Sequence, residues 1–300
     1  MYEYKLPHSC FMQWCGFLID DPALLTVTRA PVPAAAGTPS ARMASEDAWR
    51  YNEDADIHLL CLRLFGLTLR GHVLQQPLMH LRLGDFLPSI DDIEREANLP
   101  AGERLGDLVI DLTGADLTSR GVVRANVQSR HVTGGTLLDV LLSDPPKSLP
   151  FAALNKGCTS YADSFLVFKL VKPAPEACCP ANVDLSKPGT PATRRGERQY
   201  KNIAPAHQNL LAILIQSKLH QTSAPAEPFR VEYQKCIDTP IPFIFLLVTD
   251  ACKVSGEQHL TWPYNGNGYF IGSDRLPKFY GEYLHSIRTE NDLPRGNFDP

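Results

Sequence analysis

The chain has 300 residues, of which 44% are apolar and 21% charged, and its formal net charge is −4. These values are ordinary for a globular protein that can bury a sizeable core without disulfides. The acidic balance argues against a dedicated nucleic-acid binder, although Arg194, Arg195 and Arg198 form a small basic group. No apolar run reaches the roughly 18 residues of a membrane span, so we expect no membrane partner.

The eight cysteines are irregularly spaced and include no CxxC pair, so the sequence predicts no metal site. The first residues, MYEYKLPHSC, are too polar to begin a secretory signal. We therefore expect reduced thiols and an intracellular protein, either cytoplasmic or nuclear.

The N-terminal third predicts strands, a linker and one helix. Residues 10–20 are typical of a buried strand, and the Pro- and Ala-rich residues 31–47 of a loop or linker. A period-two pattern with a slip at Gly66 predicts a strand with a bulge or turn; its apolar residues are Leu60, Leu62, Leu64, Leu67 and Leu69. Ser89, with Asp92 three residues later, predicts a capped short helix.

Residues 107–112 and 122–128 alternate in polarity around a turn-rich segment, which predicts a hairpin. Asp107 and Asp111 would share one face of its first strand and, with Asp116, could bind a hard cation. A solvated sheet face is the preferred interpretation. Leucines at helical spacing after Thr136 predict a helix that ends at Pro145.

In the C-terminal half, residues 164–171 predict a strand and residues 173–197 a Pro-rich surface insertion. The good helix formers of residues 207–221 predict a helix. Two strands are expected at 229–237 and 241–251, joined by a turn, and a short helix at 280–287.

Together these elements predict an α+β fold that is strand-rich, with small antiparallel sheets and a few short helices. Alternating strand–helix–strand patterns are scarce in the sequence, which argues against a doubly wound nucleotide-binding fold. Five segments are expected: a strand segment at 1–30, a linker at 31–47, an α+β region of unknown role at 48–150, a strand-rich region at 151–290 and a tail at 291–300.

Motifs that would fix a chemistry are scarce. The sequence contains no GxxxxGK[ST], no GxGxxG after a strand, no GxSxG and no HExxH. For any one histidine or cysteine, a structural role is therefore the preferred interpretation, and Cys10 and Cys15 are expected to fill core space.

One stretch resembles a known family. The segment from Phe229 reads FRVEYQKCIDTPIPFIFLLVTDACKVSGEQHLTWPYN, and its turn at 237–240, its apolar strand and its closing GE…LTW.Y string resemble the C-terminal half of a SET domain. This fold is that of many protein-lysine methyltransferases. The strand DSFLVFKL at 163–170 is similar to another segment of that family.

The resemblance implies a lysine methyltransferase that uses S-adenosylmethionine and acts on a protein substrate. Tyr264 would be the catalytic tyrosine, because a phenol oxygen can orient the amine for in-line methyl transfer, and Trp262 would line the substrate channel. The family's NHSC cofactor segment is replaced by residues 214–219, and no cofactor-binding residue carries over. The resemblance therefore implies a divergent or degenerate member.

The alternative is a non-enzymatic α+β module that binds a protein partner. Under that interpretation Trp262 and Tyr264 pack beside the Asn/Gly turn at 265–268, and the Pro-rich segments are variable surface. A second string, WCGFLIDDPALLTV at 14–27, resembles the primer grip of telomerase reverse transcriptase. That family's catalytic aspartates precede the string, so we expect no polymerase activity from it.

Overall fold

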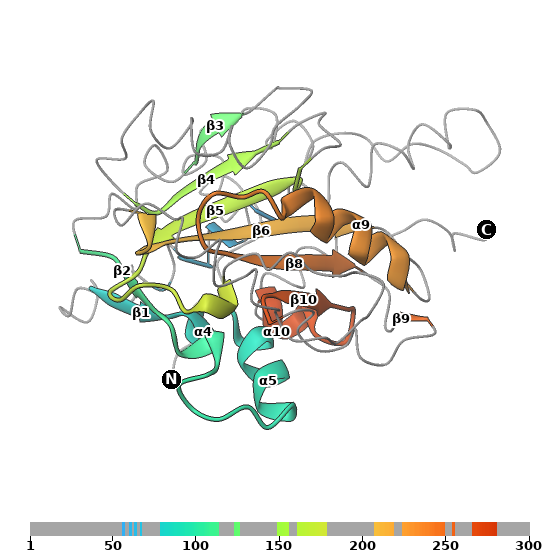
Figure 1. Ribbon diagram of the computed structural model, residues 1–300, viewed down its shortest axis with the longest axis horizontal. Coiled ribbons are helices and arrows are strands. Elements are labelled where there is room, and N and C mark those ends of the chain that lie inside the picture. Colours follow the sequence, from blue (N-terminus) through green and yellow to red (C-terminus); the bar gives the residue numbers. More distant parts are fainter. Residues whose placement is uncertain are drawn as a thin grey trace, which may run out of the picture.

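The computed structural model describes most of the chain between residues 79 and 280 (Figure 1). The described ranges are 79–113, 123–126, 149–155, 161–178, 207–218, 224–249, 254–255 and 266–280, with residues 56, 57, 60, 61, 63, 64 and 67. The elements expected at 10–20, 31–47 and 136–144 lie outside these residues.

A mixed six-stranded sheet forms the centre of the molecule, in the order β10-β8-β6-β5-β4-β3 (Figure 1). Strands β4, β5 and β6 form an antiparallel meander, whereas β8 and β10 run parallel to β6, and β3 runs parallel to β4. The strands are β3 Val123–Asn126, β4 Phe151–Leu154, β5 Ser164–Lys169, β6 Leu210–Lys218, β8 Phe243–Thr249 and β10 Gly268–Ile271.

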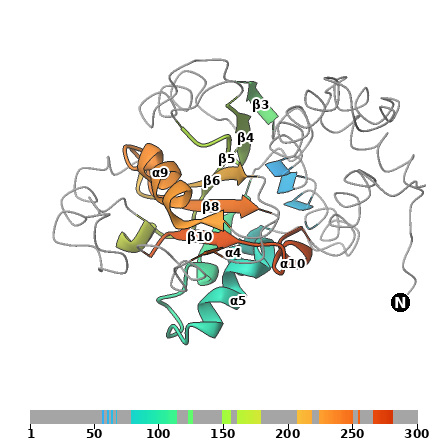
Figure 2. The same ribbon diagram turned by 90° about the vertical axis from the view of Figure 1, so that its right-hand side faces the viewer.

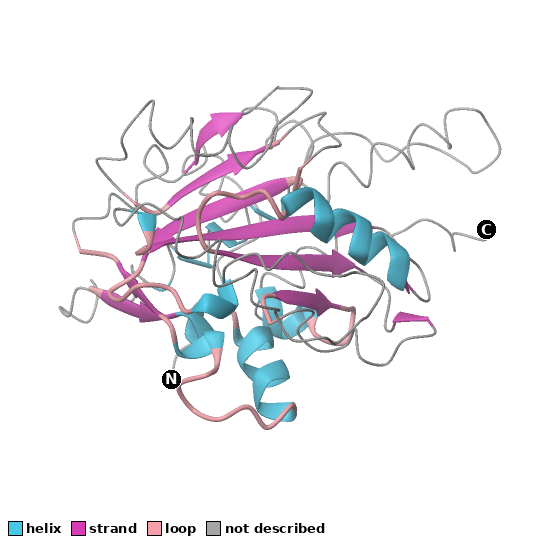
Figure 3. Cartoon of the chain, viewed as in Figure 1, coloured by secondary structure: helices cyan, strands magenta, loops and turns pink. Residues whose placement is uncertain are grey.

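Smaller elements complete the α+β fold, which confirms the predicted class (Figure 3). Strands β1 His80–Arg82 and β2 Val109–Asp111 pair antiparallel, and β7 Ala224–Pro225 and β9 Val254–Ser255 pair parallel. The helices are α4 Leu83–Phe86, α5 Pro88–Glu96, α9 Ala226–Cys236 and α10 Leu276–Tyr280, with short 3-10 turns η1 Leu105–Asp107 and η2 Glu176–Cys178. No helix among the described residues is long and apolar enough to cross a membrane.

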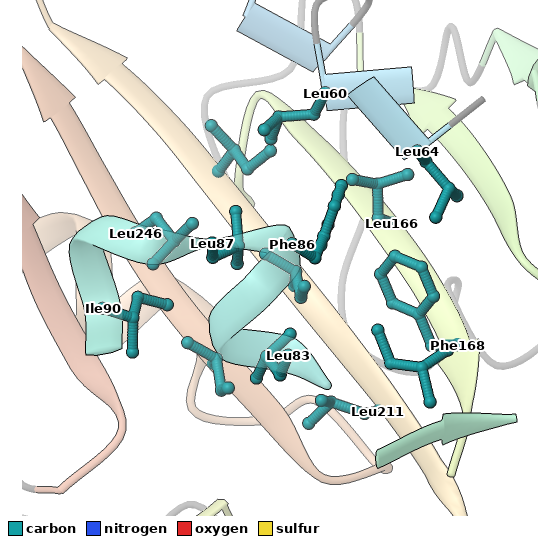
Figure 4. Close-up of a cluster of buried hydrophobic side chains, with 14 of the residues drawn as sticks. Leu60, Leu64, Leu83, Phe86, Leu87, Ile90, Leu166, Phe168, Leu211 and Leu246 are labelled. Atoms are coloured by element: carbon teal, nitrogen blue, oxygen red, sulfur yellow. The ribbon is translucent and has the colours of Figure 1, made fainter. Parts of the chain in front are cut away.

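Helices lie on both faces of the sheet (Figure 2), and each face buries a separate hydrophobic cluster. On one face, α9 packs through Phe229 and Tyr233. On the other face, the helical residues Ile57, Leu60 and Leu64 together with α4, α5 and α10 cover the sheet. Figure 4 shows this second cluster, with Leu60 and Phe86 lying over Leu166 of β5.

Residues 207–221 were expected to form a helix, and this prediction was wrong, because residues 210–218 form strand β6. Leu211 and Ile213 lie in one cluster, whereas Ala212 and Leu214 lie in the other. A central strand buried on both faces needs apolar residues at every position, so its composition resembles that of a buried helix.

The prediction of a strand at 229–237 was also wrong, because helix α9 covers residues 226–236. Phe229, Tyr233 and Cys236 are buried at helical spacing, whereas Val231 is 45% exposed. The alternation of Phe229, Val231 and Tyr233 was therefore coincidental. Helix α9 is the crossover between the parallel strands β6 and β8, a connection that parallel pairing requires.

The expected strand around Leu60 is likewise helical where it is described. Ile57, Leu60 and Leu64 are fully buried on one helical face, although Leu60 and Leu64 also fit a period of two. The strands predicted at 164–171 and 241–251 are confirmed as β5 and β8. Of the short helix expected at 280–287, only Tyr280 is described, as the last residue of α10, and residues 281–287 lie outside the described part.

The hairpin predicted from residues 107–112 and 122–128 does not form, because β2 pairs with β1 and β3 with β4. Asp107 lies in a 3-10 turn and pairs with Arg82 at 3.0 Å, and Asp111 pairs with Lys169 at 2.8 Å. The two carboxylates therefore do not share a strand face.

The helix predicted at Ser89 forms as α5, but Ser89 does not cap it. Leu87 is the N-cap, Pro88 occupies the first turn, and the buried Ser89 hydroxyl donates to the carbonyl oxygen of Arg275 at 2.9 Å. The hydroxyl thus links α5 to the loop before α10.

Candidate functional site

Polar side chains meet where β6 ends and β5 begins. The pairing of Ser164 with Ile215 places the next residues, Asp163 and Gln216, opposite each other across the two strands. Since β6 and β8 are parallel, this is also the edge of the sheet at their carboxyl ends, where α/β sheets commonly place ligands.

The Asp163 carboxylate accepts two hydrogen bonds from the end of β6. The Gln216 amide Nε2 donates to Asp163 Oδ2, and the backbone N–H of Ser217 donates to the same oxygen at 2.9 Å. Among the described residues, no hydrogen bond to Oδ1 is present, so this oxygen is available to a further ligand.

Burial raises the pKa of the Asp163 carboxyl to about 6. Desolvation is the largest cause, and it outweighs the Ser217 N–H and the charge of Lys218, which both lower the pKa. A carboxyl with such a pKa in a polar cluster is a candidate functional group, because functional sites concentrate perturbed carboxyls.

Gln216 is 2% exposed, and its Oε1 has no hydrogen-bond partner in the described part of the chain. A buried carbonyl oxygen without a partner costs about 1–3 kcal/mol, so we expect it to bind a water or another ligand. Rotation about the terminal torsion of Gln216 would exchange the amide nitrogen for this oxygen beside Asp163.

Lys218, two residues after Gln216 on the same face, brings a positive charge to the site. Its Nζ lies 3.2 Å from Oε1 of Glu232 on α9, and Lys235 Nζ lies 2.7 Å from Oε2 of the same carboxylate. Glu232 is 7% exposed and is thus held between two lysines. Helix α9 thereby fixes the position of the Lys218 ammonium.

On the opposite face of β6, the Ser217 hydroxyl donates to Oδ2 of Asp56 at 2.5 Å. The Tyr280 hydroxyl of α10 donates to Oδ1 of the same fully buried carboxylate. These bonds connect the end of β6 to helical residues on the face of the sheet opposite the site. They therefore help to fix the strand that carries Gln216 and Lys218.

The site predicted from the sequence, Tyr264 with Trp262, lies outside the described residues. One strand that supported the SET resemblance, at 229–237, is helix α9. No motif of known chemistry in the sequence marks Asp163, Gln216 or Lys218. The signal was the polar Gln-Ser-Lys ending of an apolar run, which is informative once that run is assigned as a strand.

The oxygens of Asp163 and Gln216 suit a hard divalent cation. Among the described residues, no group of three or more His, Cys, Asp and Glu could hold a metal ion. Magnesium does not require such a group, because it keeps several waters and is often held by one or two carboxylates together with substrate phosphates. Amide oxygens are also ligands for hard cations.

The chain was compared with protein-family models, with curated proteins and with solved structures, and none of them matches.

Proposed function

We propose that the protein is a divalent-cation-dependent hydrolase of phosphodiester bonds, with nucleic acid as its substrate. The observation that carries this proposal is the Asp163 carboxylate beside the Gln216 amide, whose buried Oε1 has no hydrogen-bond partner among the described residues. Lys218 adds a positive charge two residues away. A carboxylate, an amide oxygen and an ammonium together suit a phosphate group bound through Mg²⁺ or Mn²⁺.

In the proposed reaction, a water oxygen joins phosphorus and one ester P–O bond breaks, which yields a phosphate monoester and an alcohol. The cation, when bound, would polarise the phosphoryl group and make water more acidic. Asp163 and Gln216 would hold the cation through their oxygens and so position the phosphate, and Lys218 would stabilise the negative charge that develops on the phosphate. Glu232 keeps the Lys218 ammonium in place.

The net charge of −4 does not oppose this substrate, because the relevant charge is local. Lys218 and Lys235 both lie beside the site, and each side chain is about 30% exposed, as the values of 32% and 27% show. Glu232 neutralises part of this charge, so the cation would supply much of the positive charge that a phosphodiester backbone needs.

The test is cleavage of fluorophore-labelled single- and double-stranded DNA and RNA by the full chain with Mg²⁺ or Mn²⁺. We expect cleavage by the wild type, and loss of cleavage in Asp163→Asn and in EDTA. Asp238→Asn is the matched control, because Asp238 is an exposed aspartate outside the site. Equal cleavage by Asp163→Asn would indicate a contaminating nuclease and overturn the proposal, as would inactivity of the wild type on all four substrates.

The methyltransferase hypothesis from residues 229–265 remains a separate prediction, and calorimetry distinguishes the two. A methyltransferase binds S-adenosylmethionine without a metal, and Tyr264→Phe should keep that binding because the tyrosine acts on the methyl acceptor. Binding of S-adenosylmethionine together with an absence of Mn²⁺ binding would favour it. Binding of Mn²⁺ without binding of S-adenosylmethionine would favour the hydrolase.

A further inference from the structure

Asn155 continues the row of polar side chains on the α9 face of the sheet. Its backbone N–H donates to the carbonyl oxygen of Asp163 at 2.8 Å, which extends the pairing of Leu154 with Ser164. Opposite residues of antiparallel strands point to the same face. Asn155, Asp163 and Gln216 therefore lie in one row across the ends of β4, β5 and β6.

The side chain of Asn155 is buried, with 4% exposed, and its amide is oriented. Nδ2 donates to the carbonyl oxygen of Ala162 at 3.0 Å, so the other end of the amide, Oδ1, is held in a fixed direction. Oδ1 has no hydrogen-bond partner in the described ranges. The Asp163 carboxylate is thus flanked by two amides whose buried oxygens have no partner among the described residues. Gln216 directs its Nε2 toward Asp163, so its Oε1 would reach an ion there after the amide rotates.

We infer that Asn155 Oδ1 is a third protein ligand of the cation, so that the site is built from one carboxylate and two amide oxygens on three adjacent strands. The inference rests on the proposed function, because the cation is the same. Opposite side chains of neighbouring strands have Cβ atoms about 4.5–5.5 Å apart, which brings the Asn155 amide within reach of an ion at Asp163. Water and phosphate oxygens would occupy the remaining coordination positions of an octahedral ion.

Such a donor set carries a single negative charge, contributed by Asp163. Cation affinity depends on the number of charged ligands, so the free site should bind weakly and the anionic phosphodiester should strengthen binding. The neutral Asn155 oxygen thereby couples cation binding to the presence of substrate.

Ser164 provides the matched control. Its Oγ is also buried and unpartnered among the described residues, and Ser164 is 0% exposed. It follows Asp163 in β5, so its side chain points to the opposite face, away from the row. Ser164→Ala therefore removes a comparable buried oxygen without removing a ligand.

The experiment is titration of the full chain with Mn²⁺, followed by the electron paramagnetic resonance signal of free Mn²⁺. We expect the wild type and Ser164→Ala to bind one Mn²⁺ equally, and Asn155→Ala to bind about tenfold or more weakly. Asn155→Asp adds a charged ligand and should bind more tightly than the wild type. Thermal unfolding in EDTA establishes that each variant is folded.

The outcomes separate the two proposals. Absence of Mn²⁺ binding by the wild type would overturn the proposed function and this inference together. Wild-type affinity in Asn155→Ala would overturn the role of Asn155 alone. Equal weakening by Asn155→Ala and Ser164→Ala, or weaker binding by Asn155→Asp than by Asn155→Ala, would also overturn it, because either result would reflect a general packing effect.

Discussion

The hydroxyl of Ser217 lies 2.5 Å from Oδ2 of Asp56, a residue 161 positions earlier in the chain. The backbone N–H of the same Ser217 donates to Asp163 on the other face of the sheet. One residue therefore connects a fully buried carboxylate in one layer to the candidate site in the other.

Ser217→Ala should destabilise the fold and disturb the site. Loss of a buried hydrogen bond to a charged group costs about 2 kcal/mol, and Tyr280 would remain as a donor to Asp56. Urea unfolding in EDTA measures the change in the free energy of unfolding. Ser164→Ala is the comparison, because its Oγ has no partner in the described residues, and it should change stability by much less. Equal effects in the two variants would contradict the role of the Ser217 bond.

Asp163 should make stability depend on pH in the direction opposite to most aspartates. Its pKa is raised to about 6 from 3.8, so between about pH 4 and pH 6 the folded state binds more protons than the unfolded state. Stability therefore decreases as the pH rises through this window, by at most about 3 kcal/mol from this group. Urea unfolding at several pH values in EDTA measures the slope.

Asp163→Asn removes this titration, so its stability should depend less on pH in the same window. At pH 7.5 in EDTA the variant should be at least as stable as the wild type, although it should not bind Mn²⁺ or cleave a phosphodiester. In the wild type, the affinity for Mn²⁺ should rise with pH through about 6, because protons and cations compete for the carboxylate. An unchanged pH slope in Asp163→Asn would contradict the raised pKa.

The sequence predicted the fold class and three strands of the sheet, β3, β5 and β8, but not the site. Apolar strands such as β8 were recognisable because an apolar run of this length, bounded by turn residues, is typical of a buried strand. Strand β6 was assigned as a helix, because a strand buried on both faces has no period of two. Since Gln216 and Lys218 end this strand, a helix predicted over 207–221 gives no indication that they lie beside Asp163 at the end of the sheet.

Distance along the chain is the second reason why the site could not be predicted from the sequence. Asp163 and Gln216 are 53 residues apart, and their contact depends on the register of β5 with β6. Register is a tertiary property that no local spacing encodes. Helix α9 brings Glu232 to Lys218, but the alternation of Phe229, Val231 and Tyr233 in its sequence predicts a strand.

Lys218 should contribute to turnover and not to cation binding. Lys218→Met removes the charge while keeping the aliphatic stem, and we expect a decrease in turnover of about 10²–10³-fold, the effect of losing one stabilising donor. Mn²⁺ affinity should be unchanged or higher, because a positive charge near the ion is lost. Steady-state cleavage and Mn²⁺ titration measure the two quantities separately. A parallel loss of both would show that Lys218 supports the fold of the site and does not act on the phosphate.

Gly106 should tolerate no side chain, because it lies against two buried carboxylates of α5. A Cβ there would meet Asp91 Oδ1 at 2.9 Å and Glu94 Oε2 at 3.1 Å. Glu94 cannot withdraw easily, since it accepts hydrogen bonds from the Gly106 N–H at 2.8 Å and from the Tyr269 hydroxyl at 2.7 Å. Gly106→Ala should therefore lower the free energy of unfolding by about 1–3 kcal/mol, measured by urea unfolding.

Gly84→Ala is the control for this substitution. Its Cβ would meet the guanidinium of Arg82 at 2.9 Å, the far end of a long side chain that can shift. The loss of stability should accordingly be smaller than in Gly106→Ala. Neither glycine lies near Asp163 in the sheet, so Mn²⁺ affinity should stay at the wild-type value in both variants. If Gly106→Ala proved as stable as Gly84→Ala, the carboxylates of Asp91 and Glu94 would be free to move, and the bond from Tyr269 would not hold α5 against β10.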